Sequence, residues 1–165
     1  MYKKAFISLE NLNINIPYQK FASFEELPEK HQILWKEALE ARKSSYSPYS
    51  NFTVGSAIEL ENGEIITGTN QENAAFPAGL CAERVAMYRS GIQAPEQKFV
   101  RMAICATKGK EENLRSAPPC GGCRQVMLEF EKRHQQSFEL LFTDANGDFI
   151  LINSPSDLFP FSFVF

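Results

Sequence analysis

The stretch Pro119-Cys120-Gly121-Gly122-Cys123 organises the structure expected for this chain. The residues after it are spaced as in a helix that runs from Cys120 to about Lys132. At the first turn of a helix, both sulfur atoms of a Cys-x-x-Cys pair lie on one side. Free backbone N–H groups and the helix dipole stabilise negative sulfur there. The stretch therefore predicts two thiolates that can bind one metal ion.

A third cysteine and a carboxylate lie upstream, in Cys81-Ala82-Glu83. Three thiolates leave the fourth tetrahedral position of a zinc ion open for water, which is typical of catalytic sites. Glu83 would then stand near that water without binding the metal. A redox pair is the alternative for an isolated Cys-x-x-Cys, but it does not explain Cys81. We therefore predict Cys81, Cys120 and Cys123 as zinc ligands, and we expect Cys105 to be a core residue without a role.

Four segments resemble, in order and spacing, those of cytidine deaminases of the small, homotetrameric, three-cysteine type. They are Tyr-Ser-Pro-Tyr-Ser-Asn-Phe-Thr-Val-Gly at 46–55, Asn-Gln-Glu-Asn-Ala-Ala at 70–75, Cys-Ala-Glu-Arg at 81–84 and Pro-Cys-Gly-Gly-Cys-Arg-Gln at 119–125. The resemblance implies a Zn²⁺-dependent hydrolase of pyrimidine salvage. Such an enzyme converts cytidine or 2′-deoxycytidine to uridine or 2′-deoxyuridine and ammonia by means of a zinc-activated water. Glu83 is the expected proton shuttle between water, the ring nitrogen and the departing amine.

The same resemblance implies a set of substrate-binding residues. Asn70 and Glu72 would hold the ribose hydroxyls, because an amide and a carboxylate together donate and accept hydrogen bonds. Phe52 would lie against the pyrimidine ring, and Ala82 belongs to the implied set. Two alternatives stay open from the residues alone: Asn70 and Glu72 cap a turn, and Phe52 is a core side chain.

Two arginines are candidates for stabilising the metal centre. Three thiolates give a zinc site a formal negative charge, which helix N-termini offset only in part. Arg84 or Arg124 can donate hydrogen bonds to the sulfur atoms, and the resemblance favours Arg84. The alternative for each arginine is an ordinary solvated charge at the surface.

The C-terminus carries four phenylalanines among residues 159–165. So apolar an end has to be buried, either in its own subunit or against another one. The segment Leu-Phe-Pro-Phe-Ser-Phe at 158–163 resembles a family ending whose last phenylalanine reaches the nucleoside site of a neighbouring subunit. The resemblance therefore implies a homotetramer with shared active sites, in which Phe163 closes the site of an adjacent chain.

The order of the expected elements predicts an α/β fold with a single mixed β-sheet flanked by helices. This agrees with the cytidine deaminase-like α/β/α sandwich that the resemblance implies. Residues 1–27 are expected to be an N-terminal extension and residues 28–165 the zinc-dependent deaminase domain. His31 and His134 are expected on polar helix faces and are not predicted ligands. The expected helices are 28–43, 80–89 and 120–132, and the expected strands are 14–16, 52–60, 65–69, 100–107, 138–142 and 149–152.

Composition narrows the possible partners. The net charge of −3 weighs against nucleic acid, which usually binds a basic surface, and a small nucleoside fits better. No run approaches the ~20 apolar residues of a membrane span, and the first residues lack a secretory signal. We therefore expect a cytoplasmic protein that binds neither nucleic acid nor membrane.

Two other functions remain to be weighed against cytidine deamination. One is deamination of another aminopyrimidine nucleoside, such as blasticidin S. The other is a zinc-stabilised module that binds nucleotides or RNA without catalysis. A structural zinc site has no use for Glu83, and the acidic pI of about 5.5 disfavours RNA.

Overall fold

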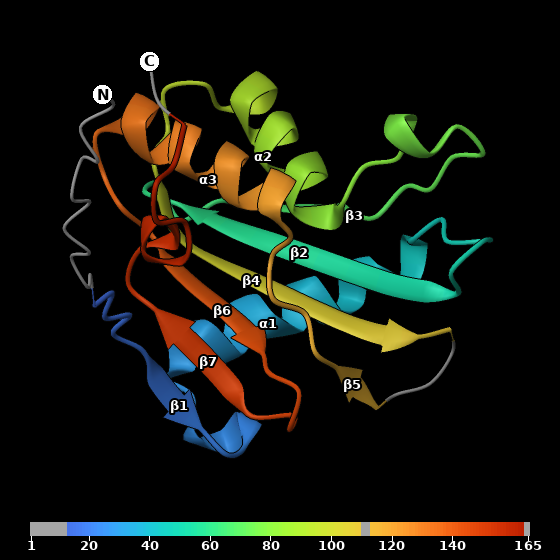
Figure 1. The fold of residues 1–165 in the computed structure, drawn as a ribbon, viewed down its shortest axis with the longest axis horizontal. Coiled ribbons are helices and arrows are strands. Elements are labelled where there is room, and N and C mark those ends of the chain that lie inside the picture. Colours follow the sequence, from blue (N-terminus) through green and yellow to red (C-terminus); the bar gives the residue numbers. More distant parts are fainter. Residues whose placement is uncertain (1–12, 110–112, 164–165) are drawn as a thin grey trace, which may run out of the picture.

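A mixed β-sheet runs through the computed structural model, whose described residues are 13–109 and 113–163 (Figure 1). Its strands are β1 (Gln19–Phe21), β2 (Phe52–Leu60), β3 (Ile65–Thr69), β4 (Phe99–Lys108), β5 (Leu114–Arg115), β6 (Glu139–Thr143) and β7 (Phe149–Ile152). The strand order is β1-β7-β6-β4-β2-β3, and β5 pairs with β4. The β4–β6 pair is parallel, whereas the other neighbours are antiparallel. The predicted single mixed sheet is confirmed.

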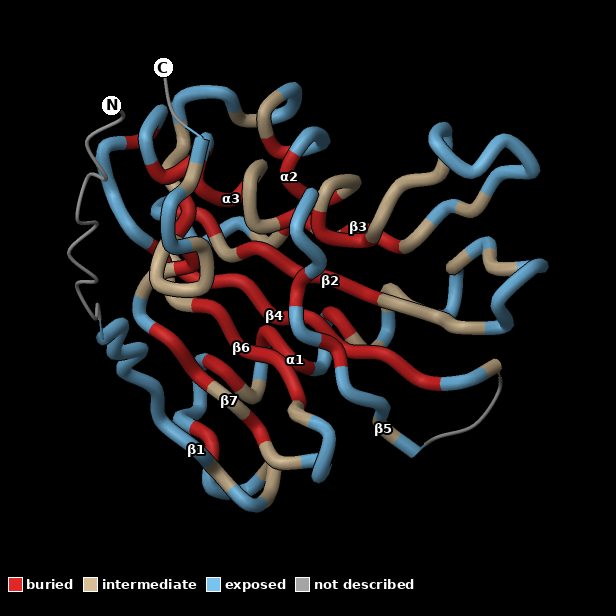
Figure 2. The backbone as a smooth tube through the Cα atoms, viewed as in Figure 1, coloured by how far each residue is buried: buried red, intermediate tan, exposed pale blue. Residues whose placement is uncertain are grey.

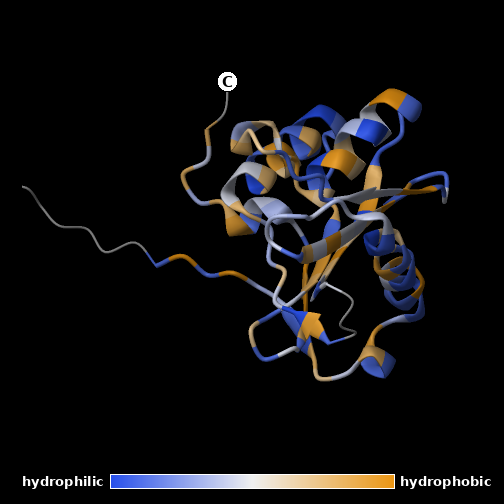
Figure 3. Cartoon of the chain, turned by 90° about the vertical axis from the view of Figure 1, so that its right-hand side faces the viewer, coloured by the Kyte–Doolittle hydropathy of each residue, from blue (hydrophilic) through white to orange (hydrophobic). Residues whose placement is uncertain are grey.

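Helices cover both faces of this sheet. Helix α1 (Glu29–Ala41) packs against β2, β3 and β4, while α2 (Ala82–Gln93) packs against β3 and β2 and contacts α3 (Gly121–His134). Adjacent residues of a strand point to opposite faces. Accordingly, Ala57 belongs to the core under α1, and Ile58 belongs to the core under α2 and α3. Figure 2 shows the buried residues along the central strands and the inner helix faces, and Figure 3 shows the hydrophobic residues concentrated there.

Two glycines set how closely the helices approach the sheet. A Cβ atom on Gly55 of β2 would lie 2.0 Å from the carbonyl oxygen of Ala38 in α1. A Cβ atom on Gly68 of β3 would lie 2.4 Å from the backbone nitrogen of Ala86 in α2. Both distances are well below van der Waals contact. The backbone of α2, which begins next to Cys81, therefore lies directly on β3.

Most expected helices and strands agree with the observed ones to within a few residues. The helix expected to end at Arg89 instead continues through Gly91 to Gln93. Gly91 packs beside Phe130 and Arg133 of α3, and this tertiary contact outweighs the low helix propensity of glycine.

The strand expected at 14–16 was wrong. Ile14 and Ile16 are exposed and outside any strand, and the chain joins the sheet later, at β1. Lys20 of β1 forms an ion pair with Asp148, next to the partner strand β7. Long-range pairing, rather than local alternation, thus determines where this strand forms. β1 lies within the expected N-terminal extension, and the domain boundary at residue 28 stays a prediction.

The two histidines do not lie on polar faces as expected, because both are buried. His31 lies over the sheet with its Nε2 atom 3.1 Å from a carboxylate oxygen of Glu139. His134 accepts a hydrogen bond from the backbone N–H of Phe99 at 3.4 Å and packs edge-on against the Phe99 ring. Burial lowers the pKa of both histidines.

Among the helices in the described part of the chain, none is long and apolar enough to cross a bilayer.

Candidate metal centre and substrate pocket

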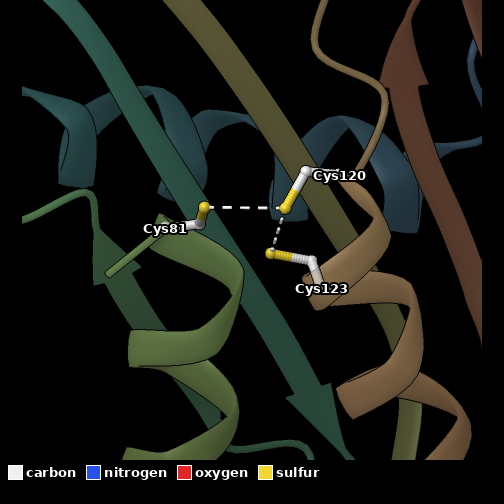
Figure 4. A group of neighbouring side chains, drawn as sticks. All are labelled: Cys81, Cys120 and Cys123. Carbon is white, nitrogen blue, oxygen red and sulfur yellow. Dashed lines mark hydrogen bonds between the residues drawn. The ribbon is translucent and has the colours of Figure 1, made fainter. Parts of the chain in front are cut away.

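The N-terminal ends of α2 and α3 bring three cysteines together (Figure 4). The Sγ atoms of Cys81 and Cys120 are 3.8 Å apart, and those of Cys120 and Cys123 are 3.4 Å apart. All three sulfur atoms lie within 4.8 Å of one another, and none is in a disulfide. Sulfur atoms about 2.3 Å from a tetrahedral zinc ion would be separated by about 3.8 Å. The observed cluster therefore fits a zinc ion held by three thiolates.

Two helix N-termini point their free N–H groups toward this cluster. Cys81 is the N-cap of α2 and Cys120 is the N-cap of α3, both with extended backbone. Cys123 lies in the first turn of α3, as the Cys-x-x-Cys spacing predicted. The partial positive charge of two helix ends offsets part of the negative charge of the sulfurs.

The cysteine side chains also differ in acidity. The pKa of Cys81 is lowered to about 5, mainly because Cys123 donates a hydrogen bond to its sulfur and because Arg84 adds a second one. The same hydrogen bond, together with burial, raises the pKa of Cys123. The contact with Arg84 favours the thiolate form of Cys81, which is the form that binds a metal ion. By contrast, burial raises the pKa of Cys105 to about 12, in keeping with the core position expected for it.

Glu83 lies in the first turn of α2 and is buried, with 4% of its surface exposed. Burial above all, with a smaller contribution from the nearby charge of Cys81, raises the pKa of its carboxyl to about 7. A carboxyl group with a pKa near neutrality can both take up and release a proton during one reaction cycle. Its interactions with Cys81 and Cys123 put this carboxyl group beside the sulfur cluster, where an acid–base group could act on a metal-bound water.

The two candidate arginines make different contacts. Arg84 donates from Nη2 to the Cys81 sulfur at 3.8 Å and to the carbonyl of Gly79 at 3.3 Å. Arg124 instead donates from Nε to the carbonyl of Pro119 and from Nη1 to the carbonyl of Leu158, each at 2.9 Å. Arg84 therefore has the expected contact with a ligand, while the donors of Arg124 lead to backbone carbonyls.

A cavity of about 570 Å³ opens in front of the sulfur cluster. Its volume lies in the range of small-molecule sites. Its wall includes seven of the residues singled out from the sequence, namely Phe52, Asn70, Glu72, Cys81, Glu83, Arg84 and Cys120. Sequence reasoning missed the apolar wall residues Val54 and Ile104, which alternate along strands like ordinary core residues, and Phe76. Phe163 is not part of the wall formed by the described residues of this chain.

The polar groups in this wall also fasten the loop before β2. Asn70 Oδ1 accepts from the Val54 N–H at 2.8 Å, and Asn70 Nδ2 donates to the Phe52 carbonyl at 2.8 Å. The Glu72 carboxylate accepts from the N–H and hydroxyl groups of Ser50 and from the Tyr49 N–H. These hydrogen bonds, that of the Ser50 hydroxyl above all, lower the pKa of Glu72. Asn70 and Glu72 therefore both stabilise this turn and line the pocket.

Comparison with known proteins agrees with this geometry. The model of the cytidine and deoxycytidylate deaminase zinc-binding region matches residues 28–137. The chain belongs to this family. The zinc-binding region of the family and the cluster of Cys81, Cys120 and Cys123 together identify Zn²⁺ as the cofactor.

Individual relatives are cytidine deaminases. The cytidine deaminase of Halalkalibacterium halodurans is 42% identical over 98 residues, which cover 59% of this chain and 70% of the relative. That of Sporosarcina psychrophila is 37% identical over 113 residues, covering 68% and 76%. The crystal structure of cytidine deaminase from Burkholderia pseudomallei matches with a TM-score of 0.67 at 36% identity and covers 81% of this chain and 98% of that one. The resemblance seen in the sequence and the expected sandwich fold are thus confirmed.

Proposed function

We propose that the protein is a zinc-dependent nucleoside aminohydrolase that converts cytidine and deoxycytidine to uridine and deoxyuridine with release of ammonia. The observation that carries the proposal is the buried Glu83 carboxyl beside three converging thiols at the wall of a nucleoside-sized cavity. A purely structural metal site needs no carboxyl group of this kind. Membership of the cytidine deaminase family supports the same reaction.

In this proposal Cys81, Cys120 and Cys123 hold the zinc ion. When bound, the zinc ion supplies a Lewis acid that lowers the pKa of water and so provides a nucleophile at neutral pH. Arg84 stabilises the negative charge of the ligand set through its contact with the Cys81 sulfur.

Glu83 carries the protons. Its carboxylate accepts a proton from the attacking water and delivers it to the ring nitrogen beside the reacting carbon. Glu83 then takes the second proton from the hydroxyl group that the water leaves on the ring carbon and delivers it to the amine. The carbon–nitrogen bond breaks, ammonia leaves, and the water oxygen stays on the ring as a carbonyl. A pKa of about 7 suits a group that works in both directions.

The remaining pocket residues hold the nucleoside. Phe52, on the pocket wall, offers an aromatic face to the pyrimidine. Asn70 and Glu72 bind the sugar hydroxyls through the hydrogen-bond donors and acceptors that their contacts with the loop do not use. Ala82, at the start of α2 next to Cys81, is fully buried and lies outside the described pocket wall, so the resemblance alone includes it in the set.

The wider role extends beyond this one pocket. We place the reaction in pyrimidine salvage in the cytoplasm, with residues 28–165 as the deaminase domain and residues 1–27 as its extension.

We also propose a homotetramer in which Phe163 closes the site of an adjacent subunit. Phe161 and Phe163 are 88% and 65% exposed in the single chain, which supports burial against a second one rather than in their own core. Phe165 lies outside the described residues.

An ultraviolet assay of the purified, zinc-loaded protein tests the function. Cytidine, deoxycytidine and blasticidin S are offered separately, and the absorbance change of the base and the release of ammonia are followed together. The proposal expects turnover of cytidine and deoxycytidine. Turnover of blasticidin S alone, or of none of the three by a protein with stoichiometric zinc, would overturn it.

A further inference from the structure

The C-terminal segment, residues 154–163, lies beside α3 (Figure 1). Three side chains of the helix hold it there. Glu131 accepts hydrogen bonds from the Ser154 hydroxyl at 2.7 Å and from the Ser156 N–H at 3.2 Å. Arg124 donates to the Leu158 carbonyl at 2.9 Å, and Gln125 donates to the Phe163 carbonyl at 3.0 Å. The segment therefore contacts α3 at more than one level.

The order of these contacts gives the direction of the segment. Arg124 and Glu131 are seven residues apart, which is about two helical turns, so they share one face of α3. Ser154 is held near the end of the helix, and Leu158 is held near its beginning. The chain thus runs back along α3 toward the turn that carries Cys120 and Cys123.

Arg124 makes a second contact at that turn. Its Nε donates to the carbonyl of Pro119, which directly precedes Cys120. Pro118 and Pro119 have no backbone N–H group, so this stretch can be held by the backbone only through its carbonyls. A guanidinium group has its N–H donors in a rigid plane, and it can fix two carbonyls relative to one another in a way that a single ammonium cannot.

We propose that Arg124 is a positioning residue for the metal centre. It fixes Cys120 through the Pro119 carbonyl and joins that turn to the C-terminal segment through the Leu158 carbonyl. The Arg124 side chain then links two properties: how firmly the C-terminal segment is held on α3, and how firmly the site retains zinc. This inference rests on zinc binding by the three cysteines and is independent of the substrate.

The test uses full-length, zinc-loaded protein and three variants: Arg124→Ala, Arg124→Lys and the control Gln125→Ala. Zinc release to an excess of a chromogenic pyridylazo chelator is followed at one temperature below every melting transition. Amide hydrogen exchange is measured over residues 120–125 and 156–163. Gln125→Ala removes a contact with the segment from the neighbouring helix position but leaves the Pro119 contact in place.

We expect Arg124→Ala to release zinc roughly tenfold faster or more, the usual scale for residues that support a ligand. Exchange should quicken in both stretches. Gln125→Ala should quicken exchange near Phe163 alone, with zinc release within about twofold of the parent. Arg124→Lys keeps the charge but not the paired donors, so it should also release zinc several times faster.

Zinc release at the parent rate in Arg124→Ala, or unchanged exchange over 156–163, would overturn the proposal. Parent-like behaviour of Arg124→Lys would also overturn it, because charge alone would then account for the role of Arg124. If Arg124→Ala does not fold, the Arg124→Lys result decides. Zinc release and exchange require no turnover, so a protein that passes this test but deaminates nothing would refute only the proposed function.

Discussion

Replacing Gly68 by alanine should disturb the metal centre through the backbone, without touching a ligand. A Cβ atom at this position would lie 2.4 Å from the Ala86 nitrogen and 2.5 Å from the carbonyl oxygen of Ala82. Ordinary contact needs roughly 3.5 Å, so α2 has to move by about 1 Å. Ala82 directly follows Cys81 and precedes Glu83, and the displacement therefore reaches the first turn of α2.

The expected loss of stability follows from overpacking of the interior. Forcing an extra methyl group into a packed interior costs about 1–3 kcal/mol, and each kcal/mol lowers the melting temperature of a chain this size by about 2–4 °C. We expect a fall of about 2–12 °C. Because metal–ligand distances tolerate only about 0.2 Å, zinc affinity should fall as well.

Differential scanning fluorimetry and competition with a zinc chelator measure the two effects. Gly122→Ala is the matched control, since a Cβ atom there meets nothing within 4 Å. Alanine is also the better helix former by about 1 kcal/mol, so this variant should be as stable as the parent or slightly more so. A Gly68→Ala protein with parent-like melting and zinc affinity would refute the close approach of α2 to β3 and the reasoning built on it.

Further variants test the separate parts of the site. Cys120→Ala should lose zinc and thermal stability together, measured by metal analysis and melting; full zinc content would remove this residue from the ligand set. Asn70→Ala and Glu72→Ala should each lower cytidine turnover with zinc content unchanged, and parent-like kinetics in both would show that the sugar is held elsewhere. Subunits carrying only Glu83→Gln, mixed with subunits carrying only Phe163→Ala, should form hybrids more active than either variant. No gain after verified subunit exchange would contradict the shared site.

The relative positions of Cys120 and Cys123 could be predicted from the sequence because their geometry is local. One helical turn places Cys120 and Cys123 on the same side of α3, and a helix that starts after Cys81 carries Glu83 in its first turn. The connection between β2 and β3 is local as well: Asn-Gly, here at 62–63, is a common hairpin signal, and Gly63 has a positive φ of 84°, which glycine adopts readily.

Features that depend on distant partners were missed or wrong. β1 forms where Lys20 meets Asp148, which lies far along the chain and leaves no local signal. Arg124 reads as a candidate donor to sulfur, but its acceptor at Leu158 is 34 residues away in sequence. His31 appears polar among its charged neighbours in α1, yet it is buried against the sheet by contacts that only the tertiary fold supplies.

The central claim is that Glu83 moves protons beside a zinc ion held by three cysteines. Its most direct test compares the parent with Glu83→Gln, measuring zinc content and cytidine turnover on the same preparations. We expect equal zinc and a loss of turnover by several powers of ten, because general acid–base catalysis contributes roughly 10²–10⁴-fold per step and one group serves more than one step. Near-parent turnover in a Glu83→Gln protein that keeps its zinc would contradict the claim.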